Sequence, residues 1–142
     1  MSKSLLERAI AIAVEAHAGQ IDKAGAPYIL HPLRVMLSLT SEDERIVGVL
    51  HDVCEDCPGW DFERLRGLGF SQAILEALAS VTKIDGEAYE DFVQRAARNA
   101  IGKAVKRADL IDNSDLARIA TPTEKDRERL AKYRRALDVL NG

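Results

Sequence analysis

Apolar residues recur along almost the whole chain at a spacing near 3.6 residues, which is the period of an α-helix. No stretch rich in valine, isoleucine or threonine alternates with polar residues at a period of two, whereas the strong helix formers alanine, leucine, glutamate and arginine are abundant. The pattern predicts an all-α fold, a single bundle of about seven or eight helices.

Capping residues and glycine or proline stops indicate where these helices begin and end. Ser4 with Glu7 and Ser41 with Glu44 have the capping-box spacing, and Thr123 is expected to cap the last helix. The expected helices run from residue 5 to a stop at Gly19 and over residues 32–39, 42–56, 62–68, 71–81, 87–100, 102–118 and 124–140, with an irregular loop over 19–30. No repeat or linker divides the series, so residues 1–142 are expected to form one domain.

Composition excludes several classes of protein. The 142 residues are 46% hydrophobic and 30% charged, unlike a disordered tail or a low-complexity scaffold. The net charge of −3 disfavours general binding to nucleic acid, although a local basic pocket for a phosphorylated ligand is compatible with it. No apolar run approaches the roughly 18 residues of a membrane span, and Glu7, Arg8 and Glu15 interrupt the place of a signal-peptide core. We therefore expect a cytoplasmic protein with neither a membrane nor a nucleic-acid partner.

The segment 46–56 carries polar residues where a buried helix is expected. It begins apolar on nearly every side, but His51 and Asp52 interrupt it, and Glu55 and Asp56 follow one turn later. On a continuous helix all four crowd one flank, and burying an unpaired carboxylate costs several kcal/mol, so a bound cation would remove a conflict. The alternative is a solvated helix end with His51 satisfied in the core.

A second segment repeats this pattern. Asp109 lies in an apolar stretch, with Asn113 four residues later on the same helical face and Lys106 three residues earlier. A plain surface ion pair between Lys106 and Asp109 would also explain the spacing. His31 directly precedes Pro32 at an expected helix start, and by itself carries little information.

Together these segments resemble the HD superfamily of metal-dependent phosphohydrolases, named for an adjacent His-Asp pair such as His51-Asp52. The match is best to the hydrolase domain of the RelA/SpoT alarmone enzymes and to the stand-alone small alarmone hydrolases. It rests on HAGQ at 17–20, GAPYILHPL at 25–33, LHDVCED at 50–56, VTK at 81–83 and KRAD at 106–109 followed by Asn113. The synthetase domain of the long enzymes has no counterpart, so the resemblance implies an enzyme that only degrades.

The resemblance implies a single divalent metal ion, bound by His31, His51, Asp52 and Asp109. This mixed nitrogen and oxygen set suits Mn²⁺, Fe²⁺ or Zn²⁺, of which the family implies Mn²⁺. The one remaining histidine, His17, is interpreted as structural. The family also assigns water activation and proton transfer to Glu55 and Asp56, which are suited to it because a carboxylate can orient water and accept its proton.

On the substrate side the resemblance implies a nucleotide ligand contacted by Lys23, Lys106, Asn113 and Tyr133. The implied reaction removes pyrophosphate from the ribose 3′ position of guanosine alarmones and returns GDP or GTP. Two positions depart from the family: Asp22 stands where an arginine lies against guanine, and Asp112 stands where His or Tyr is common. Arginine and aspartate are not interchangeable at such a contact.

Three functions therefore stay open: the guanosine alarmone hydrolase, an HD phosphohydrolase for another nucleotide such as an adenine alarmone or NADPH, and a non-catalytic nucleotide-binding module.

Cys54 and Cys57 form a C-x-x-C pair, but a zinc site needs two further soft ligands and a redox motif needs a βαβ setting. We expect no cysteine chemistry, and we interpret Trp60 as a core anchor.

Overall fold

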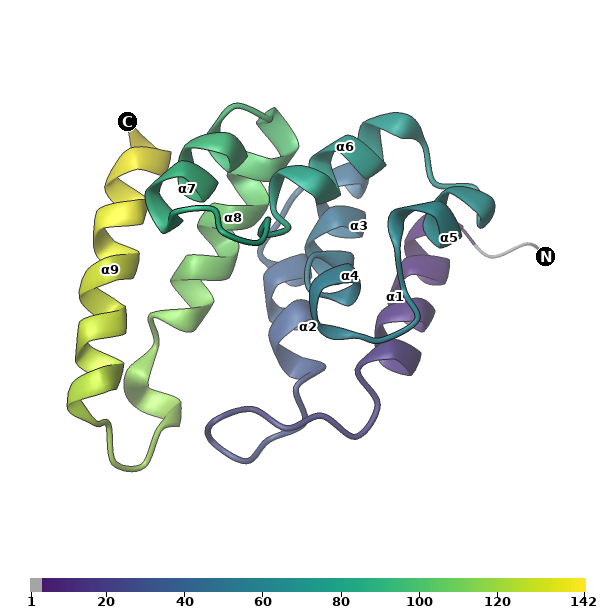
Figure 1. Ribbon diagram of the computed structural model, residues 1–142. Coiled ribbons are helices and arrows are strands. Elements are labelled where there is room, and N and C mark those ends of the chain that lie inside the picture. Colours follow the sequence, from purple (N-terminus) through teal and green to yellow (C-terminus); the bar gives the residue numbers. More distant parts are fainter. Residues whose placement is uncertain (1–3) are drawn as a thin grey trace.

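The computed structural model describes residues 4–142, and the regular elements of this part of the chain are all helices (Figure 1). The elements are α1 (Leu5–Ala16), α2 (Leu30–Leu37), α3 (Glu42–Leu50), α4 (Val53–Asp56), α5 (Phe62–Gly67), α6 (Gln72–Ser80), α7 (Tyr89–Ala97), α8 (Ala100–Asn113), the 3₁₀ helix η1 (Leu116–Arg118) and α9 (Glu124–Asn141). Between residues 4 and 142, eight helices have six or more residues and α4 is a single turn. The all-α prediction is confirmed.

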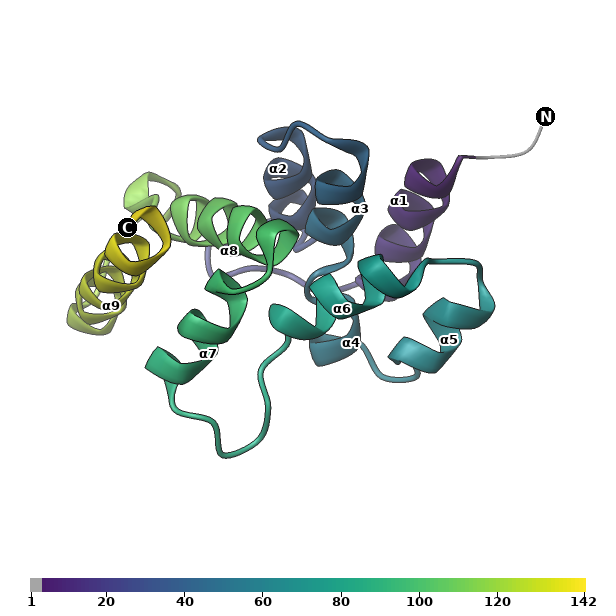
Figure 2. The ribbon, with the colours of Figure 1, turned by 90° about the horizontal axis from the view of Figure 1, so that it is seen from above.

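Helix α3 is the centre of the bundle. It packs against α1, α2, α6 and α8, and its residues from Ile46 to Leu50 are all buried. Figures 1 and 2 show α7, α8 and α9 on one side of α2 and α3, and α1 with α5 on the other. Gly48 permits the close approach of α2, because a Cβ there would lie 3.4 Å from Cγ1 of Val35 and 3.6 Å from the Cα of Met36, and 2.7 Å from Cδ1 of Leu39 just beyond the helix. The apolar start of segment 46–56 thus forms the buried central helix that the sequence predicts.

Apolar side chains form one large core and one smaller cluster. The large core joins α1, α2, α3, α5, α6 and part of α8, while Val93, Leu110, Ala136 and Leu140 hold α7, α8 and α9 together. Trp60 is half-buried at the edge of the large core, with the Arg64 guanidinium 3.6 Å from its ring centre. The expected boundary of one domain, 1–142, remains a prediction.

The continuous helix expected over 42–56 is wrong. Helix α3 ends at Leu50, His51 and Asp52 form a turn, and α4 begins at Val53. The Nδ1 atom of His51 lies 2.6 Å from the carbonyl oxygen of Gly48, so its side chain bonds to the last turn of α3. This turn, and not a helix flank, sets the direction of the two side chains.

Local capping explains most of the other boundaries. All three predicted caps, at Ser4, Ser41 and Thr123, form capping boxes. Helix α8 starts at Ala100 and not at 102, because the Asn99 side chain accepts a hydrogen bond from the Gly102 amide. It stops at Asn113, well before the expected 118. Within residues 4–142, no helix combines the length and apolar character needed to cross a membrane.

Candidate metal centre and adjoining pocket

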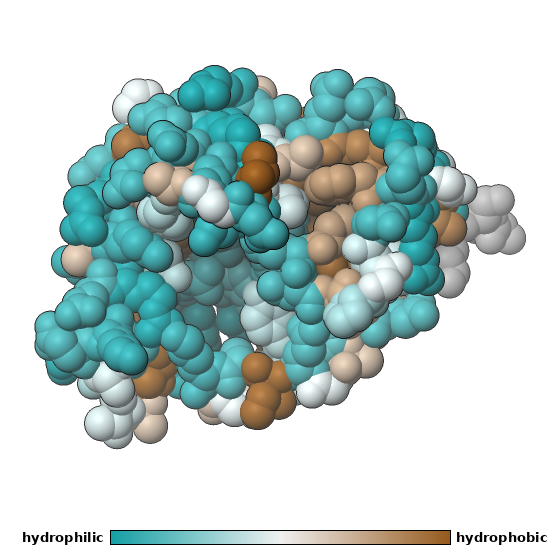
Figure 3. Space-filling view, viewed as in Figure 1, coloured by the Kyte–Doolittle hydropathy of each residue, from teal (hydrophilic) through white to brown (hydrophobic). Residues whose placement is uncertain are grey.

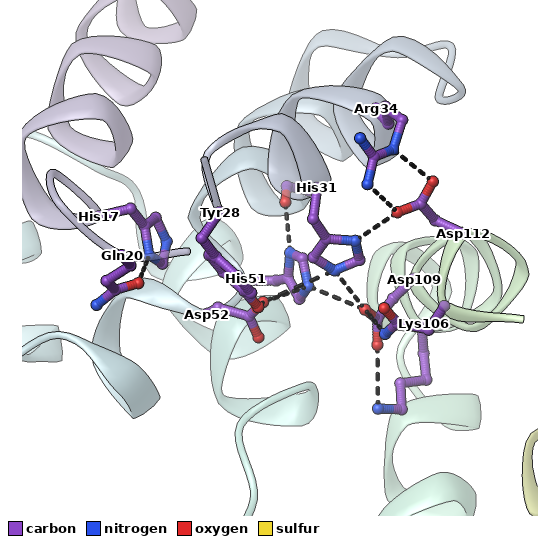
Figure 4. Close-up of polar contacts among 12 residues, drawn as sticks. His17, Gln20, Tyr28, His31, Arg34, His51, Asp52, Lys106, Asp109 and Asp112 are labelled. Atoms are coloured by element: carbon purple, nitrogen blue, oxygen red, sulfur yellow. Dashed lines mark hydrogen bonds and ion pairs between the residues drawn. The ribbon is translucent and has the colours of Figure 1, made fainter. Parts of the chain in front are cut away.

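Four side chains from three separate parts of the chain converge in the interior of the bundle (Figure 4). His31 comes from α2, His51 and Asp52 come from the turn between α3 and α4, and Asp109 comes from α8. Oδ1 of Asp109 lies 2.9 Å from Nε2 of His31 and 3.2 Å from Nε2 of His51. Oδ2 of Asp52 lies 3.1 Å from Nε2 of His51 and 3.8 Å from Nε2 of His31. Two imidazoles and two carboxylates therefore face one point.

In each histidine, the Nδ1 atom points away from the centre of the cluster and has a hydrogen-bond partner outside it. Nδ1 of His31 lies 2.7 Å from Oδ2 of Asp112, and Nδ1 of His51 bonds to the Gly48 carbonyl. An imidazole that donates from Nδ1 presents the lone pair of Nε2 to a cation, which is the usual arrangement around a metal-binding histidine. Ligand atoms of His31, His51 and Asp52 lie within 4.8 Å of one another, and Asp109 lies against both imidazoles. Imidazole nitrogens with carboxylate oxygens suit a divalent transition metal, so the residues present fit the metal ion that the fold family implies.

The charges of the cluster balance only when a cation or protons are present. Burial acts to lower the pKa of His51, but the Asp52 and Asp109 carboxylates outweigh it and hold that pKa well above its usual range. Burial acts to raise the pKa of Asp109, but Lys106 and the histidines hold it well below its usual range. The metal-free cluster thus retains protons on imidazole that a metal ion would displace.

Lys106 does not lie where a substrate contact was expected. Its side chain turns into the bundle, where Nζ lies 3.3 Å from Oδ2 of Asp109 and 4.5 Å from the ring centre of Phe92. It is buried and does not line the pocket described below. The ion pair with Asp109 exists, but it is internal and not on the surface. Lys106 therefore compensates the charge of Asp109, and the geometry gives no support to the predicted substrate contact.

Glu55 and Asp56 stand at the open edge of the cluster on α4. Both are exposed, and their carboxylate oxygens and that of Asp52 lie within 4.8 Å of one another. Burial raises the pKa of each carboxyl group, and the Asp52 carboxylate raises both further. Oε1 of Glu55 also accepts a hydrogen bond of 3.1 Å from the amide of Lys83. Their position suits proton transfer beside the cluster, and their role stays a prediction.

A pocket of about 310 Å³ adjoins the cluster between the loop after α1, the end of α8, η1 and α9. His31 and Tyr28 form part of its wall, and so do three of the four predicted substrate contacts: Lys23, Asn113 and Tyr133. Figure 3 shows a hollow on this face that is surrounded largely by hydrophilic residues.

The cations of this pocket are mostly paired already. Arg34 pairs with Asp112 at 2.8 Å, Arg118 with Asp115 at 3.2 Å, and Arg129 with Asp126 at 2.6 Å. Lys23 is exposed, lines the pocket and forms no ion pair with the described residues, so its ammonium group is available to an anionic ligand.

Asp22 has a structural use in the loop. Its Oδ1 accepts hydrogen bonds of 2.9 Å from the amides of Ala24 and Ala26, which closes the turn that carries Lys23. The aspartate that replaces the family's arginine therefore shapes the loop and supplies no planar cation to the pocket.

The remaining motif residues pack behind the site. His17 is buried against Tyr28, with ring centres 5.0 Å apart, and its Nδ1 lies 2.7 Å from Oε1 of Gln20. Cys54 and Cys57 are free thiols, and burial raises the pKa of both, that of Cys54 to about 11. Thiols with raised pKa values are poor nucleophiles at neutral pH, and the absence of cysteine chemistry stays a prediction.

Comparisons with known proteins show which sequences and folds this chain resembles. No family model matches the chain. It is 30% identical over 150 residues to a probable GTP pyrophosphokinase of Mycobacterium leprae, covering 96% of this chain and 18% of that protein. It is 33% identical over 100 residues to the bifunctional (p)ppGpp synthase/hydrolase SpoT of Escherichia coli K12, covering 66% of this chain and 14% of that protein. The chain thus spans less than a fifth of the length of these relatives.

Among solved structures, the fold matches a metazoan ortholog of SpoT described as hydrolyzing ppGpp, with a TM-score of 0.81 and 23% identity, over all of this chain and 88% of that one. The helical bundle and its buried His-Asp cluster define an HD-type domain. The resemblance to the RelA/SpoT-type HD domain, indicated by the motifs, is confirmed by the sequence relationships to both bacterial proteins and by this fold.

Proposed function

We propose that this chain is a metal-dependent hydrolase that removes the 3′-pyrophosphate from guanosine alarmones, producing GDP or GTP and pyrophosphate. The observation that carries the proposal is the convergence of His31, His51, Asp52 and Asp109 next to a pocket that offers an unpaired cation. Names of relatives that include a (p)ppGpp hydrolase activity support the choice of substrate.

The four clustered residues would hold one divalent metal ion, with Mn²⁺ proposed ahead of Fe²⁺ and Zn²⁺. When bound, such an ion stabilises negative charge on phosphate oxygens and lowers the pKa of water at the site. Glu55 and Asp56 would orient the attacking water and accept its proton, because they flank the cluster and their pKa values are raised by partial burial and by the Asp52 carboxylate.

The nucleotide would occupy the adjoining pocket. Lys23 would contact phosphate oxygens, and the ring of Tyr133 would offer a face to the base or sugar. Asn113 donates from Nδ2 to Oδ1 of Asp109 at 3.0 Å, so a ligand that contacts its side chain is placed beside the cluster. A nucleotide substrate is consistent with the cytoplasmic location expected from the sequence.

A second candidate keeps the chemistry and changes the base. The loop position expected to supply an arginine to guanine holds Asp22, whose Oδ1 is engaged by two backbone amides. Because the pocket lacks that arginine, an adenine alarmone or NADPH is the second candidate substrate. The non-catalytic module is the remaining alternative.

A substrate panel tests these proposals. The purified chain with Mn²⁺ is incubated with ppGpp, its adenine counterpart and NADPH, and released pyrophosphate and orthophosphate are measured separately. Pyrophosphate from the guanine compound alone is the expected result. Pyrophosphate only from the adenine compound, or orthophosphate only from NADPH, would establish the second candidate, and tight binding of a nucleotide without turnover would establish the module.

A further inference from the structure

Asp112 connects the metal centre to a second layer of charged residues. It lies one turn after Asp109 on α8 and faces α2, with its side chain only 12% exposed. Its Oδ2 lies 2.7 Å from Nδ1 of His31, on the side of the ring opposite to the cluster (Figure 4). In the sequence, this position stands out only as a departure from the family pattern.

The carboxylate of Asp112 is itself held at both oxygens. Arg34, one turn after His31 on α2, donates from Nε to Oδ1 at 2.8 Å and from Nη2 to Oδ2 at 3.1 Å. Arg118 adds an ion pair of 3.5 Å to Oδ2 and a hydrogen bond of 2.8 Å to the Asp112 backbone carbonyl. A carboxylate with this many fixed donors has one orientation, and so does the imidazole bonded to it.

The chemistry of the contact determines which ring nitrogen is free. A carboxylate oxygen accepts and does not donate, so the hydrogen shared with His31 belongs to Nδ1. Nε2 also lies 2.9 Å from a carboxylate oxygen, Oδ1 of Asp109, so in the metal-free cluster it shares a hydrogen as well. When that hydrogen is displaced by a cation, Nδ1 keeps its bond to Asp112 and Nε2 presents its lone pair. Nδ1 of His51 is held in the same way by the neutral carbonyl group of Gly48, whereas Nδ1 of His31 is held by a charged carboxylate. The charged partner makes Nε2 of His31 more basic and therefore a stronger metal ligand.

We infer that Asp112, held by Arg34, is a positioning residue that fixes the tautomer and ring orientation of His31 so that Nε2 binds the metal ion. The inference rests on the proposed metal centre and goes beyond it, because neither Asp112 nor Arg34 belongs to the predicted ligand set.

Metal affinity is the first test, measured by the loss of the free Mn²⁺ signal in electron paramagnetic resonance. Asp112→Ala removes the acceptor and is expected to weaken Mn²⁺ binding by about 10- to 100-fold, with Asp112→Asn falling between it and the wild type. Glu87→Gln is the control: the Glu87 side chain is 13% exposed, like that of Asp112, and it binds the guanidinium of Arg95 through two contacts of 2.9 Å. Its hydrogen bonds go to Arg95 and to the amide of Ile84, and none goes to a residue of the metal cluster. Its Mn²⁺ affinity is expected to stay within about twofold of the wild type, since only the second-layer contact to a ligand carries the effect.

Nitrogen NMR of the wild-type chain is the second test and does not depend on a variant that folds. In the Zn²⁺-loaded protein, the ¹⁵N shifts of His31 are expected to show a protonated Nδ1 and a metal-bound Nε2. A metal-bound Nδ1, or wild-type affinity in folded Asp112→Ala, would overturn the positioning role while leaving the metal centre intact. Wild-type protein that binds neither Mn²⁺ nor Zn²⁺ would instead overturn the proposed function.

Discussion

The hydroxyl of Tyr28 donates a 2.5 Å hydrogen bond to Oδ2 of Asp52, the same oxygen that lies 3.1 Å from Nε2 of His51. Burial raises the pKa of Tyr28 far above its usual range, and the Asp52 carboxylate raises it further, so the hydroxyl keeps its proton and acts as a fixed donor. Tyr28 belongs to the family motif in the sequence, but nothing in its spacing indicated this contact. Both carboxylates of the cluster therefore have a supporting donor: Tyr28 for Asp52 and Lys106 for Asp109.

Replacement of Tyr28 by phenylalanine tests the importance of this donor. The ring packing against His17 is retained, while the hydrogen bond to Asp52 is lost. We expect Mn²⁺ affinity or turnover to fall about tenfold with little change in melting temperature. Titration of Mn²⁺ and a pyrophosphate-release assay measure the two effects, and an unchanged variant in both would show that Asp52 is positioned without Tyr28.

Replacement of Asp109 by alanine is expected to abolish both metal retention and turnover. It also leaves the buried ammonium group of Lys106 without its partner, and losing one member of a buried pair costs about 3–5 kcal/mol. Unfolding in urea with a chelator present gives this free energy independently of the metal. The double variant Asp109→Ala with Lys106→Met is expected to recover part of the stability but none of the metal binding, and recovery of both would contradict the assignment of Asp109.

Replacement of Glu55 by alanine separates chemistry from metal binding. Glu55 is exposed beside the cluster and belongs to the second carboxylate group, together with Asp52 and Asp56. We expect the variant to retain its metal ion and to lose turnover by a factor of about 10²–10⁴, the usual contribution of a general base. Metal content after gel filtration measures the retained ion, and single-turnover kinetics measure the lost activity. A fully active variant would remove Glu55 from the mechanism.

The raised pKa of His51 predicts opposite pH trends for stability and for metal affinity. In the metal-free protein, protonated His51 stabilises the fold through Asp52 and Asp109, so this stability is complete below about pH 6.5 and is lost as the pH rises through the higher folded pKa. Metal binding requires neutral imidazole, so Mn²⁺ affinity rises over the same range. Melting temperatures between about pH 6 and 9, with chelator and with Mn²⁺, measure both trends. Melting temperatures that change with pH in the same way in both conditions would contradict these two trends.

Replacement of Gly48 by alanine tests the packing that brings α2 to α3. The added Cβ would meet Cδ1 of Leu39 at 2.7 Å and Cγ1 of Val35 at 3.4 Å, and overpacking of this kind costs about 1–3 kcal/mol. Gly67→Ala is the control, because no atom lies within 4 Å of its added Cβ and its backbone is helical. Urea unfolding of both variants should show a loss only for Gly48→Ala.

Short-range signals in the sequence were sufficient to locate most of the helices, but not the break at His51 and Asp52 or the ends of α8. Capping pairs such as Ser4 with Glu7 act within a single turn, and the 3.6-residue period reports which face of a helix is buried. The motifs around His31, His51 and Asp109 were also sufficient to select the residues that meet at the centre. Selection of this kind needs only the order and identity of residues along the chain.

The direction of the side chains was decided by the tertiary structure. The contact of Asp112 with His31 depends on where α8 lies against α2. The inward direction of Lys106 depends on α7, because its ammonium group lies over the ring of Phe92. His31 and Asp112 are 81 residues apart, whereas helical spacing relates only side chains three or four residues apart. Their meeting depends on how whole helices pack, because burial and long-range hydrogen bonds, and not local preference, determine which partner a polar group finds.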